Sequence, residues 1–486
     1  MTTLIKNGTL ITASETFEAD ILVEDEKISL IGQNLQHPNA DLIDATSKLV
    51  MPGGIDPHVH LDLPMFGTIS SDDHYTGHKA AAFGGTTTVM DFVVLESSSR
   101  VARSISEVEA RFEGDFKYSV DLWFEKSAKA AIDYSFHMNL TRFDEKIAKE
   151  IPSLREMGIT TLKVFTAYNG RLRLDDGSIF NALRIARENG MLVMAHCENG
   201  DVIEALVPEA LAARHTSPEY HALTRPAWGG VEATLRMAAM AEQADSPVYI
   251  VHMNVAGEVD MLKYARERGV KVMGETCPQY LFFTIDHLRR PDGAKWICSP
   301  PMRTAQDNAR LWEGLSEGIL QTIGTDHCPF FYDGTRPIVY EGREIAIPGK
   351  ELGKDDFTKI PNGLPGVEDR LPILWTTGVR SGKITANQFV AYNSTNPAKI
   401  FGLYPRKGAL LPGSDADIVI WDPEKKVTYG IAHTHQRTDY NLYEGWELTG
   451  MPEKVFLRGK LIVNGEQWLG NAGGGQFLKR KEGVFI

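Results

Sequence analysis

The feature that most constrains the fold of this chain is a series of short apolar runs in its middle, most of them separated by helical stretches. Three intervening segments, residues 178–188, 231–242 and 258–268, space their apolar residues with the period of an amphipathic helix. Buried strands that alternate with helices are typical of parallel sheets, and eight such units predict an α/β fold of the (β/α)8 TIM-barrel type. The eight runs lie at residues 50–60, 86–92, 118–124, 160–165, 191–196, 247–252, 270–275 and 320–326. The alternative fold is a doubly wound open sheet, but no G-x-G-x-x-G sequence follows any of the runs.

The two ends of the chain have a different pattern, in which apolar and polar residues alternate between turn residues. Because these ends flank a middle of another kind, we expect them to pair into one small β-sandwich domain. Residues 333–365, rich in glycine, proline and charge, predict a long loop after the last barrel strand. The expected domains are residues 1–52 and 401–465 for the two parts of the sandwich, 53–400 for the barrel and 466–486 for a C-terminal tail.

Charge and composition exclude several classes of partner. The chain has 486 residues and a net charge of −13, which argues against nucleic acid or an anionic membrane as the main partner. Its four cysteines form no C-x-x-C pair and are too sparse for a disulfide scaffold. We see no signal-peptide pattern at the N-terminus and no apolar run of about 18 residues, so we expect a soluble, cytoplasmic protein.

Unusual polar residues fall at the ends of the predicted strands, where the functional site of a barrel is built. A lone histidine in such a place is more often structural than a ligand, but five coincident placements favour a metal site. His58 and His60 are the strongest pair, because the alternation of a strand points both imidazoles to one side. The candidate residues are His58 and His60 on the first strand, Lys163 in the fourth, His196 on the fifth, His252 on the sixth and Asp326 on the eighth.

The other histidines receive a more ordinary interpretation. His433 and His435 form a second H-x-H, which lies in a polar segment outside the predicted barrel, and we assign it no role. The remaining histidines are interpreted as mostly solvated or structural: His37, His74, His78, His137, His215, His221, His287 and His327.

Lys163 is unusual because its neighbours Leu162, Val164 and Phe165 predict a strand buried on both faces. A bare ammonium there costs several kcal/mol unless it is paired. One interpretation is a lysine paired with an acid or with a lowered pKa. The other is an uncharged amine that has reacted with CO₂, giving a carbamate that bridges two cations about 3.5–4 Å apart. The lysine alone leaves both open, and two nearby histidine pairs favour the carbamate.

A series of longer motifs spans nearly the whole chain in a fixed order. They are GIDPHVHLD, GGTTTVMDF, LKVFTAYNG, MAHCEN, VHMN, ETCPQYL, SPPMR, GTDHCPF, PNGLPGVEDR, NPAKIFGLYPRKG and GSDADIVIWD. Together they resemble the amidohydrolase superfamily and, within it, the dihydropyrimidinase/D-hydantoinase branch. The H-x-H and GSDADIVIWD elements occur across the superfamily, whereas VFTAYNG, SPPMR and PNGLPGVEDR are closer to this branch.

This resemblance implies a centre of two divalent metal ions, most often Zn²⁺, bridged by a hydroxide and by Lys163 as N6-carboxylysine. The ligands that it implies are His58, His60 and Asp326 for one ion and His196 and His252 for the other.

The same resemblance implies an activity and a substrate class. The metal-bound hydroxide would open the ring amide of a 5,6-dihydropyrimidine or a 5-substituted hydantoin, giving an N-carbamoyl amino acid. Tyr168 would donate a hydrogen bond to the developing oxyanion, and Asp326 would carry the proton to the leaving nitrogen. Ser299 and Asn362 would recognise the ring amide, largely through backbone groups. The resemblance also implies a homotetramer.

Four alternatives stay open at this point. Dihydroorotase usually places an arginine two residues beyond the second histidine to meet a substrate carboxylate, and here that position is Asp62. Allantoinase shares most of the ligands but not the FTAYNG tyrosine or the PNGLPGVEDR run. A one-metal, deaminase-like hydrolase would leave Lys163 paired with an acid. A non-catalytic adaptor would have lost ligands, and all six positions are filled here.

Three segments bear on substrate range or assembly. Residues 335–348 are extra relative to the usual loop of this branch, and such a loop can cover the site or dock a neighbouring subunit. Met65, Phe66 and Tyr168 are candidates to line the pocket for a ring substituent. Residues 465–486 are candidates to reach a neighbouring subunit.

Overall fold

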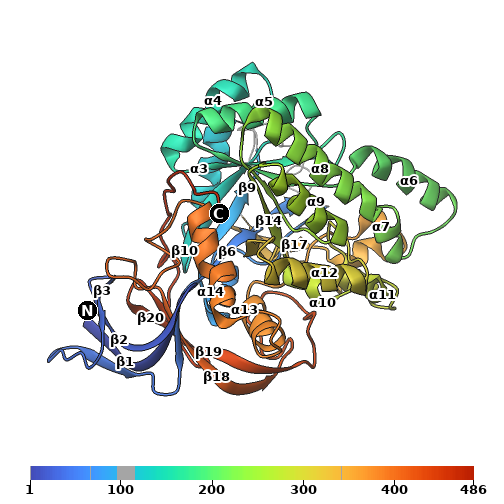
Figure 1. Ribbon diagram of the computed structural model, residues 1–486. Helices are drawn as coiled ribbons and strands as arrows, with labels where there is room; N and C mark the ends of the chain where they lie inside the picture. Colours follow the sequence, from blue (N-terminus) through green and yellow to red (C-terminus); the bar gives the residue numbers. More distant parts are fainter. Residues whose placement is uncertain (1, 66, 96–114, 341) are drawn as a thin grey trace.

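The computed structural model describes residues 2–65, 67–95, 115–340 and 342–486, in which an eight-stranded parallel sheet curls into a barrel (Figure 1). The strands lie in the order β15-β14-β13-β12-β11-β10-β9-β6, with each paired parallel to its neighbour. Their bounds are β6 Gly54–Val59, β9 Thr86–Val93, β10 Asp133–Asn139, β11 Thr161–Phe165, β12 Leu192–His196, β13 Val248–Ile250, β14 Val272–Thr276 and β15 Thr322–Ile323.

The barrel closes just beyond the ends of its two edge strands, β6 and β15. The backbone N–H of His60 donates to the carbonyl of His327 at 2.7 Å, and Val59 forms a parallel bridge to the same residue. His327 forms a second bridge to Leu364. The predicted (β/α)8 barrel is therefore confirmed.

Helices cover the outside of this barrel (Figure 1). The three predicted helices lie within α5, α8 and α9, apart from one residue at the end of α9. The main helices are α1 Thr76–Phe83, α3 Phe116–Ser127, α4 Glu145–Met157, α5 Asp176–Glu188, α8 Ala227–Ala244, α9 Ala256–Glu267 and α12 Ala305–Ser316. Further helices follow β12, β14 and β15: α6 Gly200–Ala212, α7 Glu219–Leu223, α10 Pro278–Phe282, α11 Ile285–Leu288, η1 Gly293–Trp296, α13 Arg370–Leu374, η4 Trp375–Val379, α14 Ala386–Val390, η5 Ala391–Thr395 and α15 Asn396–Ile400.

The third predicted strand, residues 118–124, is wrong. This run lies in helix α3, where Phe116, Val120 and Trp123 are buried at helical spacing and the Asp115 side chain caps the first turn by accepting from the Tyr118 N–H. The third barrel strand is β10, whose residues are buried on both faces although several are polar. The polar members have partners from distant parts of the chain; for example, Lys407 donates to Asp133 at 2.6 Å.

The two ends of the chain pair in one sheet, as expected. Its order is β21-β20-β19-β18-β5-β1-β2-β3, with β4 beside β1, and strands from both ends lie together at the lower left of Figure 1. The domain limits at residues 52, 400 and 465 remain predictions. The bounds are β1 Thr2–Ile11, β2 Thr16–Glu24, β3 Lys27–Gly32, β4 Asp41–Asp44, β5 Leu49–Pro52, β18 Ile418–Thr428, β19 Glu447–Leu457, β20 Lys460–Asn464 and β21 Gln467–Trp468.

A buried cluster of charges joins this sheet to the barrel. The Lys407 ammonium lies 2.6 Å from Asp133 of β10 and 2.6 Å from Asp417, just before β18, and 3.1 Å from Asp415. Burial alone would lower the pKa of Lys407, but the three carboxylates outweigh it and hold the pKa above its ordinary value. The lysine therefore stays charged and links the two parts of the fold.

The C-terminal segment folds back onto its own barrel. The N–H of Gly475 donates to Ala130 at 2.9 Å, the N–H of Leu478 to Tyr134 at 2.7 Å, and Arg480 donates to Thr161 at 2.8 Å. That residues 465–486 also reach a neighbouring subunit stays a prediction. Val484 and Phe485 beyond them are exposed.

The predicted loop over residues 333–365 contains regular structure. Strands β16 Arg336–Tyr340 and β17 Arg343–Ile347 form an antiparallel hairpin, followed by short helices η2 Lys350–Gly353 and η3 Phe357–Lys359. The hairpin forms because Ile338, Tyr340 and Ile347 bury one of its faces. A second small hairpin, β7 Pro64–Met65 with β8 Thr68–Ile69, follows β6. No helix in the described ranges is both long enough and apolar enough to cross a membrane.

Candidate metal centre

All nine residues singled out in the sequence line one cavity at the C-terminal mouth of the barrel. The cavity has a volume of about 70 Å³ and is walled further by apolar side chains, among them Leu63, Met65 and Leu172. The strand-end pattern predicts the convergence of six of these residues, and the family resemblance implies the other three, Tyr168, Ser299 and Asn362. The individual roles of all nine remain predictions. The nine are His58, His60, Lys163, Tyr168, His196, His252, Ser299, Asp326 and Asn362.

The Asp326 carboxylate lies close to both histidines of the first pair, His58 and His60. One of its carboxylate oxygens, Oδ1, lies 3.3 Å from His58 Nε2 and 3.1 Å from His60 Nε2. Burial alone would raise the pKa of Asp326, but His58, His60 and Lys163 outweigh it and lower the pKa. The carboxylate is therefore ionised and available to a cation.

The two histidines of the second pair, His196 and His252, lie close to each other. His196 Nδ1 lies 3.1 Å from His252 Nε2. Two nitrogens that each lie about 2.0–2.1 Å from one tetrahedral zinc ion would be about 3.3 Å apart. The spacing of this pair therefore fits two ligands of one ion.

Strained backbone turns several of these side chains into the mouth. Tyr168, His252 and Asp326 have φ angles of 68°, 40° and 54°, in the left-handed region that non-glycine residues rarely adopt. Each follows the end of a barrel strand within three residues. Such conformations cost about 1–3 kcal/mol each and cluster at functional sites.

The histidine ring nitrogens at the barrel mouth are suited to bind a metal ion. His58 Nε2 has no hydrogen bond of suitable geometry among the described residues, and its nearest charged neighbour is Asp326 Oδ1 at 3.3 Å. Burial lowers the pKa of His58, His196 and His252, so their imidazoles are neutral, which is the form that binds metal. The donor set fits a divalent metal ion.

Lys163 lies in the middle of this group without an acidic partner. Its side chain is buried, with Nζ 5.1 Å from the Phe92 ring and 5.2 Å from the Phe165 ring. No carboxylate of the described chain lies within 4.0 Å of this nitrogen. Burial lowers the pKa of Lys163 to about 8, although Asp326 and Glu275 act in the opposite direction. This geometry does not support a lysine in a simple ion pair.

The sequence analysis missed Glu275, which ends the predicted seventh strand and is fully buried. Its carboxylate lies 2.7 Å from His58 Nδ1 and accepts from the Tyr249 hydroxyl at 2.8 Å and from the His252 N–H at 3.1 Å. Carboxylates in this position fix the orientation of a metal-binding imidazole. The signal was available, because an acid at a strand end of a barrel points to the functional face.

Glu198 supports the other histidine pair. One of its oxygens lies 2.9 Å from His196 Nε2 and accepts from Arg225 at 2.9 Å. Burial alone would raise the pKa of Glu198, but Arg225 and His196 outweigh it and lower the pKa to about 2. The guanidinium of Arg225 also lies over the Tyr168 ring, 5.6 Å from its centroid.

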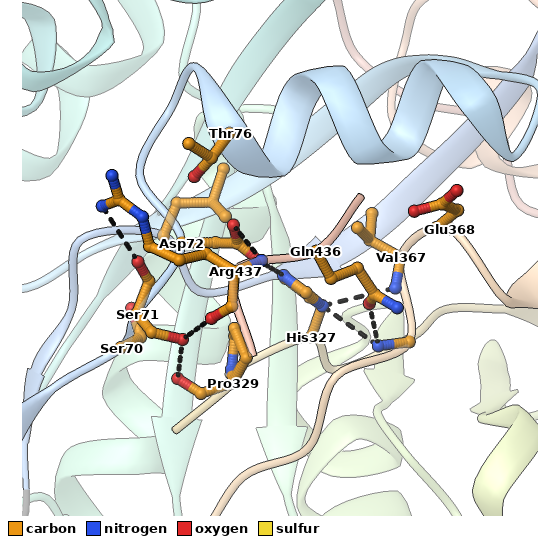
Figure 2. Close-up of polar contacts among 12 residues, drawn as sticks. Ser70, Ser71, Asp72, Thr76, His327, Pro329, Val367, Glu368, Gln436 and Arg437 are labelled. Carbon is orange, nitrogen blue, oxygen red and sulfur yellow. Dashed lines mark hydrogen bonds and ion pairs between the residues drawn. The ribbon is translucent and has the colours of Figure 1, made fainter. Parts of the chain in front are cut away.

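His327, next to Asp326, is held by a polar network (Figure 2). Its Nε2 lies 3.1 Å from the Asp72 carboxylate, and its Nδ1 accepts the backbone N–H groups of Gly366 and Val367. The backbone N–H of Arg437 donates to the same aspartate at 3.0 Å. A ring nitrogen that accepts two N–H groups carries no proton, so the network fixes one tautomer and anchors the backbone beside Asp326.

Five of the histidines interpreted as solvated or structural are buried, so they are not solvated, and a structural role for them stays a prediction. The buried ones are His74, His78, His137, His221 and His327. His435 differs from the expectation of a segment apart from the barrel. Its Nδ1 lies 2.8 Å from Glu368 Oε1, and its ring stacks on Phe83 at the end of α1.

Asp62 stands at the position where a dihydroorotase usually has an arginine. It does not line the cavity, and its carboxylate lies 3.9 Å from the Lys129 ammonium. An acidic residue here would be expected to repel a substrate carboxylate, but Asp62 is not placed to do so from the cavity lining. Met65 and Tyr168 do line the cavity, and Phe66 lies outside the described residues.

Comparison with known proteins identifies the family. The model of the amidohydrolase family matches residues 49–462, so the chain belongs to that family. The chain is 44% identical to a D-hydantoinase of Geobacillus stearothermophilus over 484 residues, which cover 99% of this chain and 97% of the relative. It is 40% identical to a D-hydantoinase of Streptomyces coelicolor, with 98% of each chain covered. The crystal structure of a dihydropyrimidinase from Brevibacillus agri matches with a TM-score of 0.92 and 45% identity over 100% of both chains.

By these relatives, the chain falls in the D-hydantoinase/dihydropyrimidinase group of the family. Membership of the amidohydrolase family implies a binuclear metal centre. His58, His252 and Asp326 form a candidate metal site, because their ligand atoms all lie within 4.8 Å of one another.

We predict that Glu275→Gln weakens metal binding about 10–100-fold, because the neutral amide no longer stabilises the Nδ1–H of His58. Competition with a chelator measures the affinity. Glu258→Gln is the matched control, since Glu258 is also buried but accepts the backbone N–H groups of Asn254 and Val255. Equal metal affinity in wild type and Glu275→Gln would show that this carboxylate plays no supporting part.

Proposed function

We propose that this protein hydrolyses the ring amide of cyclic diamides, namely 5,6-dihydropyrimidines and 5-substituted hydantoins, to N-carbamoyl amino acids. The observation that carries the proposal is the single cavity lined by the candidate ligands together with Tyr168, Ser299 and Asn362. The names of the relatives, D-hydantoinase and dihydropyrimidinase, support the same reaction. All six proposed ligand positions are filled, which disfavours a non-catalytic adaptor.

The ligands of the two ions are proposed to be His58, His60 and Asp326 for one and His196 and His252 for the other, with carboxylated Lys163 between them. Zinc suits this set of imidazoles and carboxylates. When bound, the ions supply hydroxide at neutral pH by lowering the pKa of water, and they polarise the scissile carbonyl.

Carboxylation of Lys163 needs an uncharged amine, and burial favours one by lowering the pKa of Lys163 to about 8. The Nζ lone pair attacks the carbon of CO₂, an N–C bond forms, and one N–H proton leaves to solvent. The resulting carbamate anion has two oxygens for two cations. The lack of a carboxylate within 4.0 Å of Lys163 in the described chain supports this proposal over a simple ion pair.

Asp326 is proposed to move the proton. Its lowered pKa keeps it ionised, so it can accept the proton of the attacking water and return it to the leaving ring nitrogen.

Tyr168 is proposed to stabilise the developing oxyanion. Burial raises the pKa of Tyr168 to about 12, although Arg225 acts in the opposite direction, so the phenol keeps the proton that it must donate.

Ser299 and Asn362 lie next to each other, with the Asn362 amide donating to the Ser299 hydroxyl at 3.1 Å. They are proposed to recognise the ring amide. We also propose that the protein is a homotetramer and that it acts in the cytoplasm.

Metal-reconstituted protein offered dihydrouracil, hydantoin, dihydroorotate and allantoin side by side tests the function. We expect hydrolysis of dihydrouracil and hydantoin, with kcat/KM at least about 100-fold lower for dihydroorotate, because the described residues that line the cavity include no arginine to pair with its carboxylate. We also expect a lower kcat/KM for allantoin, because its polar ureido substituent would lie against apolar side chains such as Leu63, Met65 and Leu172. Chelator-treated protein is the control and should be inactive. A preference for dihydroorotate or allantoin would contradict the proposal.

We predict that Tyr168→Phe lowers kcat about 10²–10³-fold, the usual cost of removing one oxyanion donor, while bound metal is unchanged. Steady-state kinetics and metal analysis of the same preparation measure both. Tyr264→Phe is the control, because Tyr264 is exposed on α9. A kcat equal to that of wild type would exclude the proposed role of Tyr168.

A further inference from the structure

One wall of the cavity is a very short hairpin. Strands β7 and β8 pair through only two residue pairs, Pro64 with Ile69 and Met65 with Thr68. Leu63 and Met65 face the cavity. We name β7, β8 and Leu63 the pocket wall. A hairpin of this length is not stable by itself in water, so its position depends on what lies behind it.

The β16–β17 hairpin packs behind the pocket wall. Ile69 of β8 is fully buried in a small apolar cluster with Phe331, Ile338, Tyr340 and Ile347. This cluster is separate from the main core of the barrel. The Thr68 hydroxyl donates to the carbonyl of Pro348, immediately after β17, at 2.6 Å.

Lys126 ties the same hairpin to the start of the wall. Its buried ammonium donates to the carbonyl of Asp62 at 2.9 Å and to the Tyr340 hydroxyl at 3.2 Å. It also lies between the rings of Trp123 and Tyr340, 4.2 and 4.9 Å from their centroids. A buried lysine is costly unless it is held in this way, so the contact defines one arrangement of hairpin, helix α3 and wall.

We propose that the β16–β17 hairpin is a buttress that fixes the pocket wall against the bound ring and so determines selectivity for an apolar substituent on that ring. The inference rests on the proposed function and adds to it a chain-specific element outside the cavity. Neither β16 nor β17 contributes a residue to the cavity lining, so the hairpin acts through the wall. Its residues are positioning residues.

The chemistry of the wall defines the class of substituent. Leu63 and Met65, with Phe165 and Leu172 across the cavity, present apolar surface without a charge. An alkyl substituent at ring position 5 gains contact energy only if this surface is held close to it, because dispersion falls steeply with a gap of 0.5–1 Å. An unsubstituted ring has no such substituent, so its hydrolysis should not depend on the position of the pocket wall.

The test compares 5-isopropylhydantoin with unsubstituted hydantoin in the metal-reconstituted full chain. In the double variant Ile338→Ala/Tyr340→Ala we expect the ratio of kcat/KM, substituted over unsubstituted, to fall about tenfold, the usual value of one or two apolar contacts. Tyr340→Phe, which keeps the ring and loses only the hydroxyl bonded to Lys126, should lower the ratio about threefold. Val339→Ala is the matched control, because Val339 lies on the same strand with its side chain exposed on the opposite face.

Hydrogen exchange of the substrate-free protein supplies a readout that does not depend on activity. The Ser70 N–H donates to Leu63, and the Asp62 N–H donates to Asp72, both at 2.9 Å. We expect these amides to exchange about tenfold faster in the double variant and unchanged in Val339→Ala.

Active wild type together with an unchanged or increased ratio in both Tyr340 variants would overturn the buttress. If the double variant does not fold, the kcat/KM ratio measured for Tyr340→Phe decides the test by itself. Wild type that hydrolyses dihydrouracil but not 5-isopropylhydantoin would also overturn the proposed selectivity. Wild type that hydrolyses neither dihydrouracil nor either hydantoin would instead overturn the proposed function, and the two failures are therefore distinguishable.

Discussion

The hydrogen bond from the His60 N–H to the His327 carbonyl is the contact on which the rest of the site depends. It joins the ends of β6 and β15, the two edges of an otherwise open sheet, and closes the barrel. Closure places His60 next to Asp326, 3.1 Å from its carboxylate. The His327 side chain then holds this closure in place, because Asp72 and the backbone at Gly366 and Val367 occupy both of its ring nitrogens (Figure 2). His327 therefore links the closure of the barrel to the geometry of the candidate metal centre.

Around that centre, buried carboxylates determine what the histidines can do. Glu275 and Glu198 each lie within 2.9 Å of one ring nitrogen, of His58 and His196 respectively, which leaves the other nitrogen of each ring to face the mouth. Burial keeps these imidazoles neutral. Such a concentration of neutral nitrogen donors beside an ionised Asp326 is unfavourable in a protein interior, and divalent cations would relieve the cost.

Much of the fold and of the site was predictable from the sequence because the signals are local. Apolar runs that contain or end in His, Lys or Asp mark the barrel strands, and all six candidates found in this way line one cavity. Tyr168, Ser299 and Asn362 line the same cavity, but only the resemblance to a known family pointed to them. The misassigned third strand shows where local signals end. The polar residues of β10 are satisfied by distant partners, as when Ser135 donates to Leu478, and no local pattern reveals such contacts. In the same way, the β16–β17 hairpin is defined by its contact with Ile69, far away in the chain.

The most direct test of the account is the electron density of active, zinc-reconstituted protein, with diffraction data collected at the zinc absorption edge. The account predicts two anomalous peaks at the barrel mouth, one beside His58, His60 and Asp326 and one beside His196 and His252, with the density of a carboxyl group on Lys163 Nζ between them. A plain amine at Lys163 together with an empty or single-ion centre, in crystals of fully active protein, would contradict it.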